Sequence, residues 1–304
     1  KVASIEFGNN DANDMSLTVN GATLTVGGNI SQDFIPGYIN FIFPISQSLT
    51  TTLAGTGTII CQNFLVGDTT HPTIFTNNLT KVSSQINQLT VNGNIVLNAE
   101  GDNNYIIFLG YFDVNYPEFS FDNNNLLLKG QIVTTSDNNP SSALSGLSGI
   151  GLFTSDNNSN NTTIELPNAN PIATPIESGF SINFTGGGSG SGTVLYNNAS
   201  GTQTVYTTIT SGLGNNNNYD NLTLSGASAK TVLGGALTIT SDWNTSGGAI
   251  NLNSNNTVVT VGDDWTNSAV ITQGFGNISV TDDLINSGTL NLGTGSLTIA
   301  GNYT

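Results

Sequence analysis

The chain has 304 residues, of which only 8% are charged: 20 are Asp or Glu, four are Lys, and Arg is absent. A soluble domain usually carries about 25% charged residues. The net charge of −16 argues against nucleic acid and anionic membrane surfaces as partners, because both are bound through clustered Lys and Arg. No apolar stretch approaches the roughly 20 residues that span a bilayer, so we expect no membrane span.

The rest of the composition favours an all-β protein outside the cell. Asn occurs 45 times and Gly 36 times, yet 37% of the residues are hydrophobic and occur in short β-branched runs, which argues against disorder. Cys61 is the single cysteine, so an intramolecular disulfide is excluded and we expect a buried thiol. The scarcity of Lys and Arg leaves few trypsin-type cleavage sites, which suits an extracellular location.

Residues 1–100 predict irregular coils of a β-solenoid with capping or inserted hairpins. Alternating apolar and hydroxyl residues that end in Gly or Asn recur at 17–21, 24–28 and 89–93, which is typical of half-buried strands followed by tight corners. Three similar corners contain Asn29, Asn63 and Asn94. The aromatic segment 36–44 is expected to be an inserted hairpin or a cap over an open end of the solenoid.

Residues 101–200 predict a less regular β region with loops. The aromatic run 105–112, the Pro-containing stretch 155–175 and the Gly/Ser run 186–192 interrupt any repeat. For this region a β-sandwich remains an alternative to the solenoid, because both have many short strands.

Residues 201–304 predict regular coils of about 20 residues. A large apolar residue recurs as Trp243, Trp265, Leu284 and Tyr303, in steps of 22, 19 and 19 residues. Such a period with several short strands per unit is the signature of a right-handed parallel β-helix, in which these residues form one column about 4.8 Å apart. Trp243 and Trp265 are then expected to fill the core. Asn267 and Asn286 would form a hydrogen-bonded ladder between coils.

The candidate site is a group of four acids, Asp263, Asp264, Asp282 and Asp283. If the coils stack, Asp263 lies on Asp282 and Asp264 on Asp283. Three interpretations follow: solvated corners, a Ca²⁺ site built from carboxylates, or a glycosidase-type carboxylate pair. We expect no cofactor other than a Ca²⁺ ion if these acids form such a site, and we predict no catalytic residue. Lys230 has no cationic neighbour, which weakens a lyase mechanism, and His71 lacks the partners of a zinc site or triad.

The stretches 221–239 and 286–303 resemble the β-helical repeats of large bacterial surface adhesins of the filamentous-haemagglutinin-like kind, and those of giant surface proteins that gliding bacteria export by the type IX system. The resemblance covers 215–304 well, 15–100 moderately and the middle poorly. It implies a secreted, elongated, cell-surface protein. Because the chain stops inside a repeat, we expect a segment of a larger adhesin or filament.

These observations predict a non-enzymatic, extracellular structural or adhesive protein. Its partners would be cell-surface or extracellular components, among them glycans or copies of itself, contacted by loops of the middle region. The alternative is a carbohydrate-active β-helix enzyme, a polysaccharide lyase or glycosidase, that uses Asp263, Asp264, Asp282 and Asp283.

Overall fold

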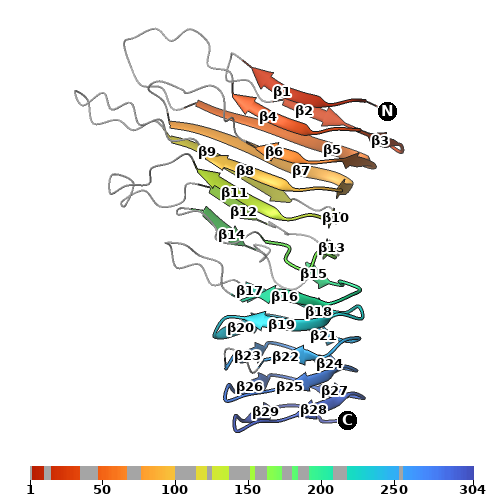
Figure 1. Ribbon diagram of the computed structural model, residues 1–304, viewed down its shortest axis with the longest axis vertical. Helices are drawn as coiled ribbons and strands as arrows, with labels where there is room; N and C mark the ends of the chain where they lie inside the picture. The colour runs from red at the N-terminus through yellow and green to blue at the C-terminus, as the bar shows by residue number, and fades with distance from the viewer. Residues whose placement is uncertain are drawn as a thin grey trace, which may run out of the picture.

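The computed structural model describes residues 2–9, 15–34, 47–66, 77–99, 114–121, 125–136, 151–154, 163–172, 180–183, 192–207, 218–252 and 256–304. These residues form 29 strands and no helix, and every described pair of strands is parallel. The strands stack from one end of the molecule to the other in chain order (Figure 1). The predicted all-β parallel β-helix is therefore confirmed.

The strands belong to four sheets. Sheet 1 contains β1 (Ile5–Asn9), β4 (Ile30–Phe34), β6 (Phe64–Val66), β8 (Ile95–Ala99) and β11 (Ile132–Ser136). Sheet 3 contains β16 (Thr202–Tyr206), β19 (Ala229–Leu233), β22 (Ile250–Asn251), β25 (Val270–Thr272) and β28 (Thr289–Asn291). Sheet 4 contains β17 (Asn218–Tyr219), β20 (Ala236–Ile239), β23 (Val258–Val261), β26 (Ile278–Val280) and β29 (Leu297–Ile299).

Sheet 2 has 14 strands and runs through the whole described molecule. Its strands are β2 (Met15–Thr18), β3 (Thr23–Thr25), β5 (Gln47–Cys61), β7 (Asn77–Val91), β9 (Val114–Phe121), β10 (Asn125–Leu128), β12 (Gly151–Thr154), β13 (Thr163–Leu166), β14 (Phe180–Asn183), β15 (Thr193–Tyr196), β18 (Asn221–Leu224), β21 (Trp243–Thr245), β24 (Trp265–Asn267) and β27 (Leu284–Asn286). The described strands of the middle region all pair in parallel, β11 in sheet 1 and the others in sheet 2, so the β-sandwich alternative is wrong for them.

One column of inward-facing residues follows sheet 2 from coil to coil. We call it the central column; it consists of Leu24, Ile59, Leu89, Leu126, Ile164, Val194, Leu222, Trp243, Trp265, Leu284 and Tyr303. The predicted stack of Trp243, Trp265, Leu284 and Tyr303 is its last part. From Ile59 to Leu284 each member is buried, whereas Tyr303 in the last coil is 59% exposed. The column therefore forms a continuous core.

The coils narrow along the chain. Successive members of the central column are between 28 and 38 residues apart up to Leu222, and we call these the wide coils. After Leu222 they are between 19 and 22 residues apart, and we call these the narrow coils. The wide coils extend sheet 2 sideways: the first half of β7 pairs with β9 and its second half with β10, so the sheet divides into two branches. The narrow coils instead close around three sheets, 2, 3 and 4. The segment 36–44, expected to be an inserted hairpin or a cap, and the aromatic run 105–112 lie outside the described residues.

The corners between coils depend on glycine. Gly226 and Gly247 both have positive φ, at 77° and 85°, and they are stacked at the same corner. A Cβ on Gly247 would lie 2.2 Å from the carbonyl oxygen of Gly226, so a side chain would push the coils apart. This is the physical reason for the repeated ending of strand motifs in Gly.

Aromatic packing fills the narrow coils. The rings of Trp243 and Trp265 stack at a centroid distance of 4.5 Å and an interplanar angle of 20°, and both side chains are fully buried. Nε1 of Trp265 donates a hydrogen bond to Oγ1 of Thr245 at 3.1 Å. The prediction that both tryptophans are core residues is confirmed. Cys61 is also buried, as predicted, and burial raises the pKa of its thiol to about 12.

Candidate functional site: an acidic edge

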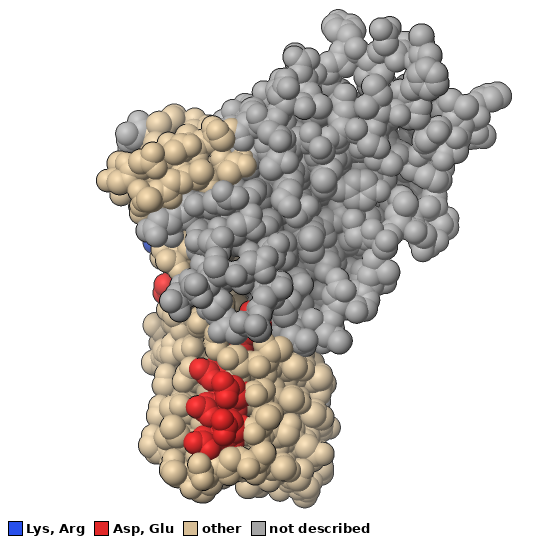
Figure 2. All heavy atoms as spheres, turned by 180° about the vertical axis from the view of Figure 1, so that it is seen from behind, with Lys and Arg blue, Asp and Glu red and all other residues tan. Residues whose placement is uncertain are grey.

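Five aspartates lie along one edge of the C-terminal coils. Asp242, Asp263, Asp264, Asp282 and Asp283, here called the acidic edge, occupy the corners where a strand of sheet 4 ends and the next strand of sheet 2 begins. They form a single strip on the surface (Figure 2). The strip arises because the coil repeat places equivalent corners one above the other.

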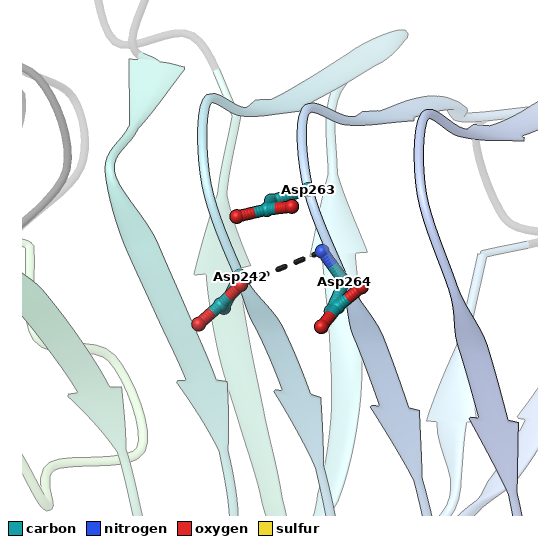
Figure 3. A group of neighbouring side chains, drawn as sticks. All are labelled: Asp242, Asp263 and Asp264. Atoms are coloured by element: carbon teal, nitrogen blue, oxygen red, sulfur yellow. Dashed lines mark hydrogen bonds between the residues drawn. The ribbon is translucent and has the colours of Figure 1, made fainter. Parts of the chain in front are cut away.

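The inner members of the acidic edge have a structural task. Oδ1 of Asp242 accepts the backbone N–H of Asp264 at 3.4 Å, as Figure 3 shows, and Oδ1 of Asp264 accepts that of Asp283 at 3.0 Å. Oδ1 of Asp283 continues the series at 2.7 Å to the backbone N–H of Asn302. Asn221 does the same for the backbone N–H of Asp242 at 3.2 Å. Each of these side chains therefore connects its coil to the next, and an Asn can serve as well as an Asp.

The outer members, Asp263 and Asp282, are exposed. The neighbouring carboxylate of Asp283 raises the pKa of Asp282, with desolvation and the charges of Asp264 and Asp263 as smaller causes. Like charges at this distance disfavour the ionised form of the group between them. The outer acids therefore add negative charge to the acidic edge but take no part in the hydrogen bonds of Asp242, Asp264 and Asp283 between coils.

The carboxylates fall into two groups of three. Asp242, Asp263 and Asp264 form one group (Figure 3), and Asp264, Asp282 and Asp283 form the other; within each group, one oxygen per residue lies within 4.8 Å of the others. The sequence predicted the stack of four acids; the structure adds Asp242 and makes Asp264 common to both groups. Carboxylate oxygens at this spacing are ligands that suit Ca²⁺. The calcium site stays a prediction.

The described surroundings of the acidic edge include no exposed tryptophan. Trp243 and Trp265 begin the strands next to it, but their rings are buried and cannot form a platform for a sugar. Glycoside hydrolysis requires two carboxylates on opposite sides of the bond that is cleaved. The five aspartates instead follow one another along the surface.

Lys230 lies inside the solenoid, a placement that the sequence analysis missed. Its side chain is only 1% exposed, and Nζ donates to the carbonyl oxygen of Ser228 at 3.1 Å and to Oγ of the same residue at 2.7 Å. Burial lowers the pKa of Lys230 to about 8. The signal was available in the sequence, because Lys230 and the apolar Val232 are two residues apart and must share a face of their strand.

A second ladder of Asn side chains lies in the wide coils. Nδ2 of Asn63 donates to Oδ1 of Asn29 at 3.0 Å, and Oδ1 of Asn63 accepts the backbone N–H of Asn94 at 2.8 Å. The sequence showed that these three corners are alike but not that their side chains connect. The predicted bond between Asn267 and Asn286 is confirmed, at 2.8 Å between Nδ2 of the first and Oδ1 of the second.

Comparisons with protein-family models, with curated proteins and with solved structures found no match. Among the described residues, no helix has the length and apolar character needed to cross a bilayer.

Proposed function

We propose that this chain is a rod-forming part of an extracellular, non-enzymatic structural or adhesive protein at a cell surface. The observation that carries the proposal is the central column, which joins coils of very different length into one sheet. Continuous backbone ladders resist bending and pulling without the need for a cleft or a cofactor. The function is then mechanical: the coils hold binding segments at a distance from the cell surface.

The surface of the narrow coils supports this proposal. In residues 221–304 the charged side chains are Lys230, which is buried, and the five aspartates of the acidic edge. Outside the acidic edge, the surface combines exposed apolar side chains, among them Val258, Phe275 and Ile285, with neutral hydroxyl and amide groups, as in the outward stack of Thr223, Asn244 and Thr266 on sheet 2. A residue repeated in every coil stacks on its copies, so neutral polar groups avoid the repulsion that a charged stack would create.

The binding partners are proposed to be extracellular or cell-surface components, glycans and copies of the chain among them. Of the middle-region loops that were expected to contact them, 186–191 lies outside the described residues, whereas the prediction of a loop over 155–175 is wrong for Thr163–Leu166, which form strand β13.

The proposal is tested by locating the protein on its source cells. Antibodies raised against residues 218–304 should label intact cells as strongly as permeabilised ones, and purified protein should bind to surfaces coated with extracellular material. Labelling that requires permeabilisation would contradict the surface location.

The carbohydrate-active alternative has its own assay. Purified protein is incubated with neutral and acidic polysaccharides, and new reducing ends or unsaturated products are measured. Turnover that disappears in the Asp263→Asn and Asp282→Asn variants would favour the enzyme over the rod; the proposal predicts no turnover with either variant or with the unaltered chain.

A further inference from the structure

The contact between two neighbouring coils has strand pairing on one side only, as has the contact before it, whereas the contact after it has strand pairing on two sides. The first of these coils contains residues 163–172 and the second residues 192–207; we call the contact between them the junction. In sheet 2 the two coils of the junction are joined by strand pairing, since β13 and β15 pair over four residues.

On the opposite side, the backbone ladder is interrupted. Sheet 1 ends at β11 and sheet 3 begins at β16, and the described residues 167–172, which lie between these two strands on this side, form no strand. A single bridge joins Ile132 to Ile172 below the junction. Across the junction itself, the backbone N–H of Thr204 donates to the carbonyl oxygen of Ala169 at 2.8 Å.

Side chains make most of the remaining polar contacts across this interruption. Nε2 of Gln203 donates to the carbonyl oxygens of Leu166 and Asn168, at 2.6 and 2.8 Å. The hydroxyl of Tyr206 donates to the carbonyl oxygen of Ile172 at 2.9 Å. Gln203 and Tyr206 are both buried, so these bonds lie inside the molecule.

Three further side-chain bonds cross the junction. They join Asn198 to the carbonyl oxygen of Pro167 at 2.6 Å, Thr204 to Asn170 at 2.9 Å, and Asn197 to Glu165 at 2.6 Å. In the contact that follows, strands pair on two sides: β15 pairs with β18 over four residues, and β16 pairs with β19 over five.

A stacked protein unfolds as one unit only where the contacts between its repeats are strong. Its stability is close to the sum of repeat stabilities and nearest-neighbour contacts, so the weakest contact decides where cooperativity ends. On the side of sheets 1 and 3, the junction has individual side-chain hydrogen bonds in place of strand pairing, and each of these bonds adds little net stability. The change from wide to narrow coils follows one coil later, after Leu222.

We propose that the junction separates two cooperative unfolding units, the first up to residue 172 and the second from residue 192 onward, which includes the narrow coils. This inference concerns the fold and holds whether or not the proposed adhesive function is correct. Under force or denaturant, one unit unfolds while the other keeps its structure.

The tryptophans allow a direct test in the full chain. The chain has two Trp, and both Trp243 and Trp265 belong to the second unit, so Trp fluorescence reports that unit alone. Far-UV circular dichroism reports strands of both units. In urea the two signals should give midpoints that do not coincide, which is the standard sign of more than one unfolding unit.

Two variants place the boundary at the junction. Tyr206→Phe removes only the hydroxyl that binds Ile172, and Gln203→Leu removes the donor to Leu166 and Asn168. Each should move the earlier transition by about 0.5 M to lower urea and leave the later one in place. Tyr303→Phe is the matched control, because it removes a hydroxyl that contacts Asn286 at the far end of the narrow coils.

Two results would overturn the inference. One is coincidence of fluorescence and circular dichroism midpoints in the unaltered chain and in both junction variants, which would show a single cooperative unit. The other is a shift of both transitions together in Tyr206→Phe, which would show that the boundary lies elsewhere.

Discussion

At the corner of each narrow coil, an Asn or Asp side chain accepts the backbone N–H of the equivalent residue in the next coil. The series runs through Asn221, Asp242, Asp264 and Asp283 to Asn302. The hydrogen bond needs an acceptor oxygen at this position but no charge. Two substitutions at one position can therefore separate the two properties.

Asp264→Ala should lower the free energy of unfolding by about 1 kcal/mol, because the backbone N–H of Asp283 loses its acceptor. Asp264→Asn keeps the oxygen and removes one charge from the acidic edge, so it should match or exceed the unaltered chain. Urea unfolding followed by Trp fluorescence measures both. Equal destabilisation by Ala and Asn would show that the charge, and not the acceptor, is what the position requires.

Lys230 predicts a dependence of stability on alkaline pH. Burial lowers its pKa from 10.5 to about 8, so between these values the unfolded chain holds a proton that the folded chain has released. Stability from this group therefore rises with pH across that window. The difference in unfolding free energy between the unaltered chain and Lys230→Met should grow in favour of the unaltered chain from pH 7.5 to about 10.

The comparison with Lys230→Met is needed because other groups titrate there. Burial raises the pKa values of Tyr196, Tyr219 and Cys61, so their contributions fall with rising pH. These contributions are common to both proteins and cancel in the difference. A difference that stays constant with pH would contradict the assignment to Lys230.

The residue patterns of the narrow coils could be read from the sequence because their coils have nearly constant length. Trp243, Trp265 and Leu284 appear at regular steps, and the bond between Asn267 and Asn286 follows from the same alignment. The burial of Lys230 was missed because a charged residue is normally assigned to solvent, although the alternation of its strand placed it inside.

At the scale of the strands, the acidic edge is a place where stacking works against stability. The strand starts of β21, β24 and β27 bring five carboxylates into one row, and no positive side chain is described beside them. The repeat makes the row unavoidable once each corner carries an acid. Protons, salt or a bound cation should each relieve the repulsion.

Asp282→Asn should raise the thermal midpoint at pH 7. The raised pKa of Asp282 means that the folded chain takes up its proton before the unfolded chain does as pH falls, so acid stabilises the folded state through this group. The advantage of Asp282→Asn should therefore shrink as the pH falls, and also in 1 M salt, where the Debye length is about 3 Å. An advantage that grows with acid would contradict the repulsion.

The calcium prediction is tested by thermal melts. Ca²⁺ at about 1 mM should raise the midpoint of the unaltered chain, and a chelator should reverse the rise. The double variant Asp263→Asn/Asp282→Asn keeps the inner ladder of Asp242, Asp264 and Asp283 and should show no rise. If Ca²⁺ does not change the thermal midpoint of the unaltered chain, a structural calcium site at the acidic edge is excluded.

The wide coils could be predicted only in part. The similar corners at Asn29, Asn63 and Asn94 were visible, but the steps between members of the central column vary from 28 to 38 residues there. A variable excursion removes the period on which alignment depends. The division of sheet 2 at β7 left no signal either, because a long strand that pairs with two shorter ones has the same alternation as any other strand.

At the scale of the whole molecule, sheet 2 makes one body of wide and narrow coils. The sequence pattern predicted irregular solenoid coils for residues 1–100 and regular ones for residues 201–304, and it left residues 101–200 open between a solenoid and a β-sandwich. The structure places β10, β13 and β15 between the two ends, so the central column passes through the middle region without a break. The distance between residues that are far apart in sequence but stacked in sheet 2 therefore tests whether the stack is continuous.

Spin labels on Thr90 and Ile285 measure that distance most directly. The two positions face outward on sheet 2 and are separated by seven strand spacings, through Leu127, Glu165, Leu195, Thr223, Asn244 and Thr266. In a Cys61→Ala background, double electron–electron resonance should give one narrow distribution near 34 Å, since each spacing is about 4.8 Å. A broad distribution, or a mean beyond about 45 Å, would contradict the continuous stack.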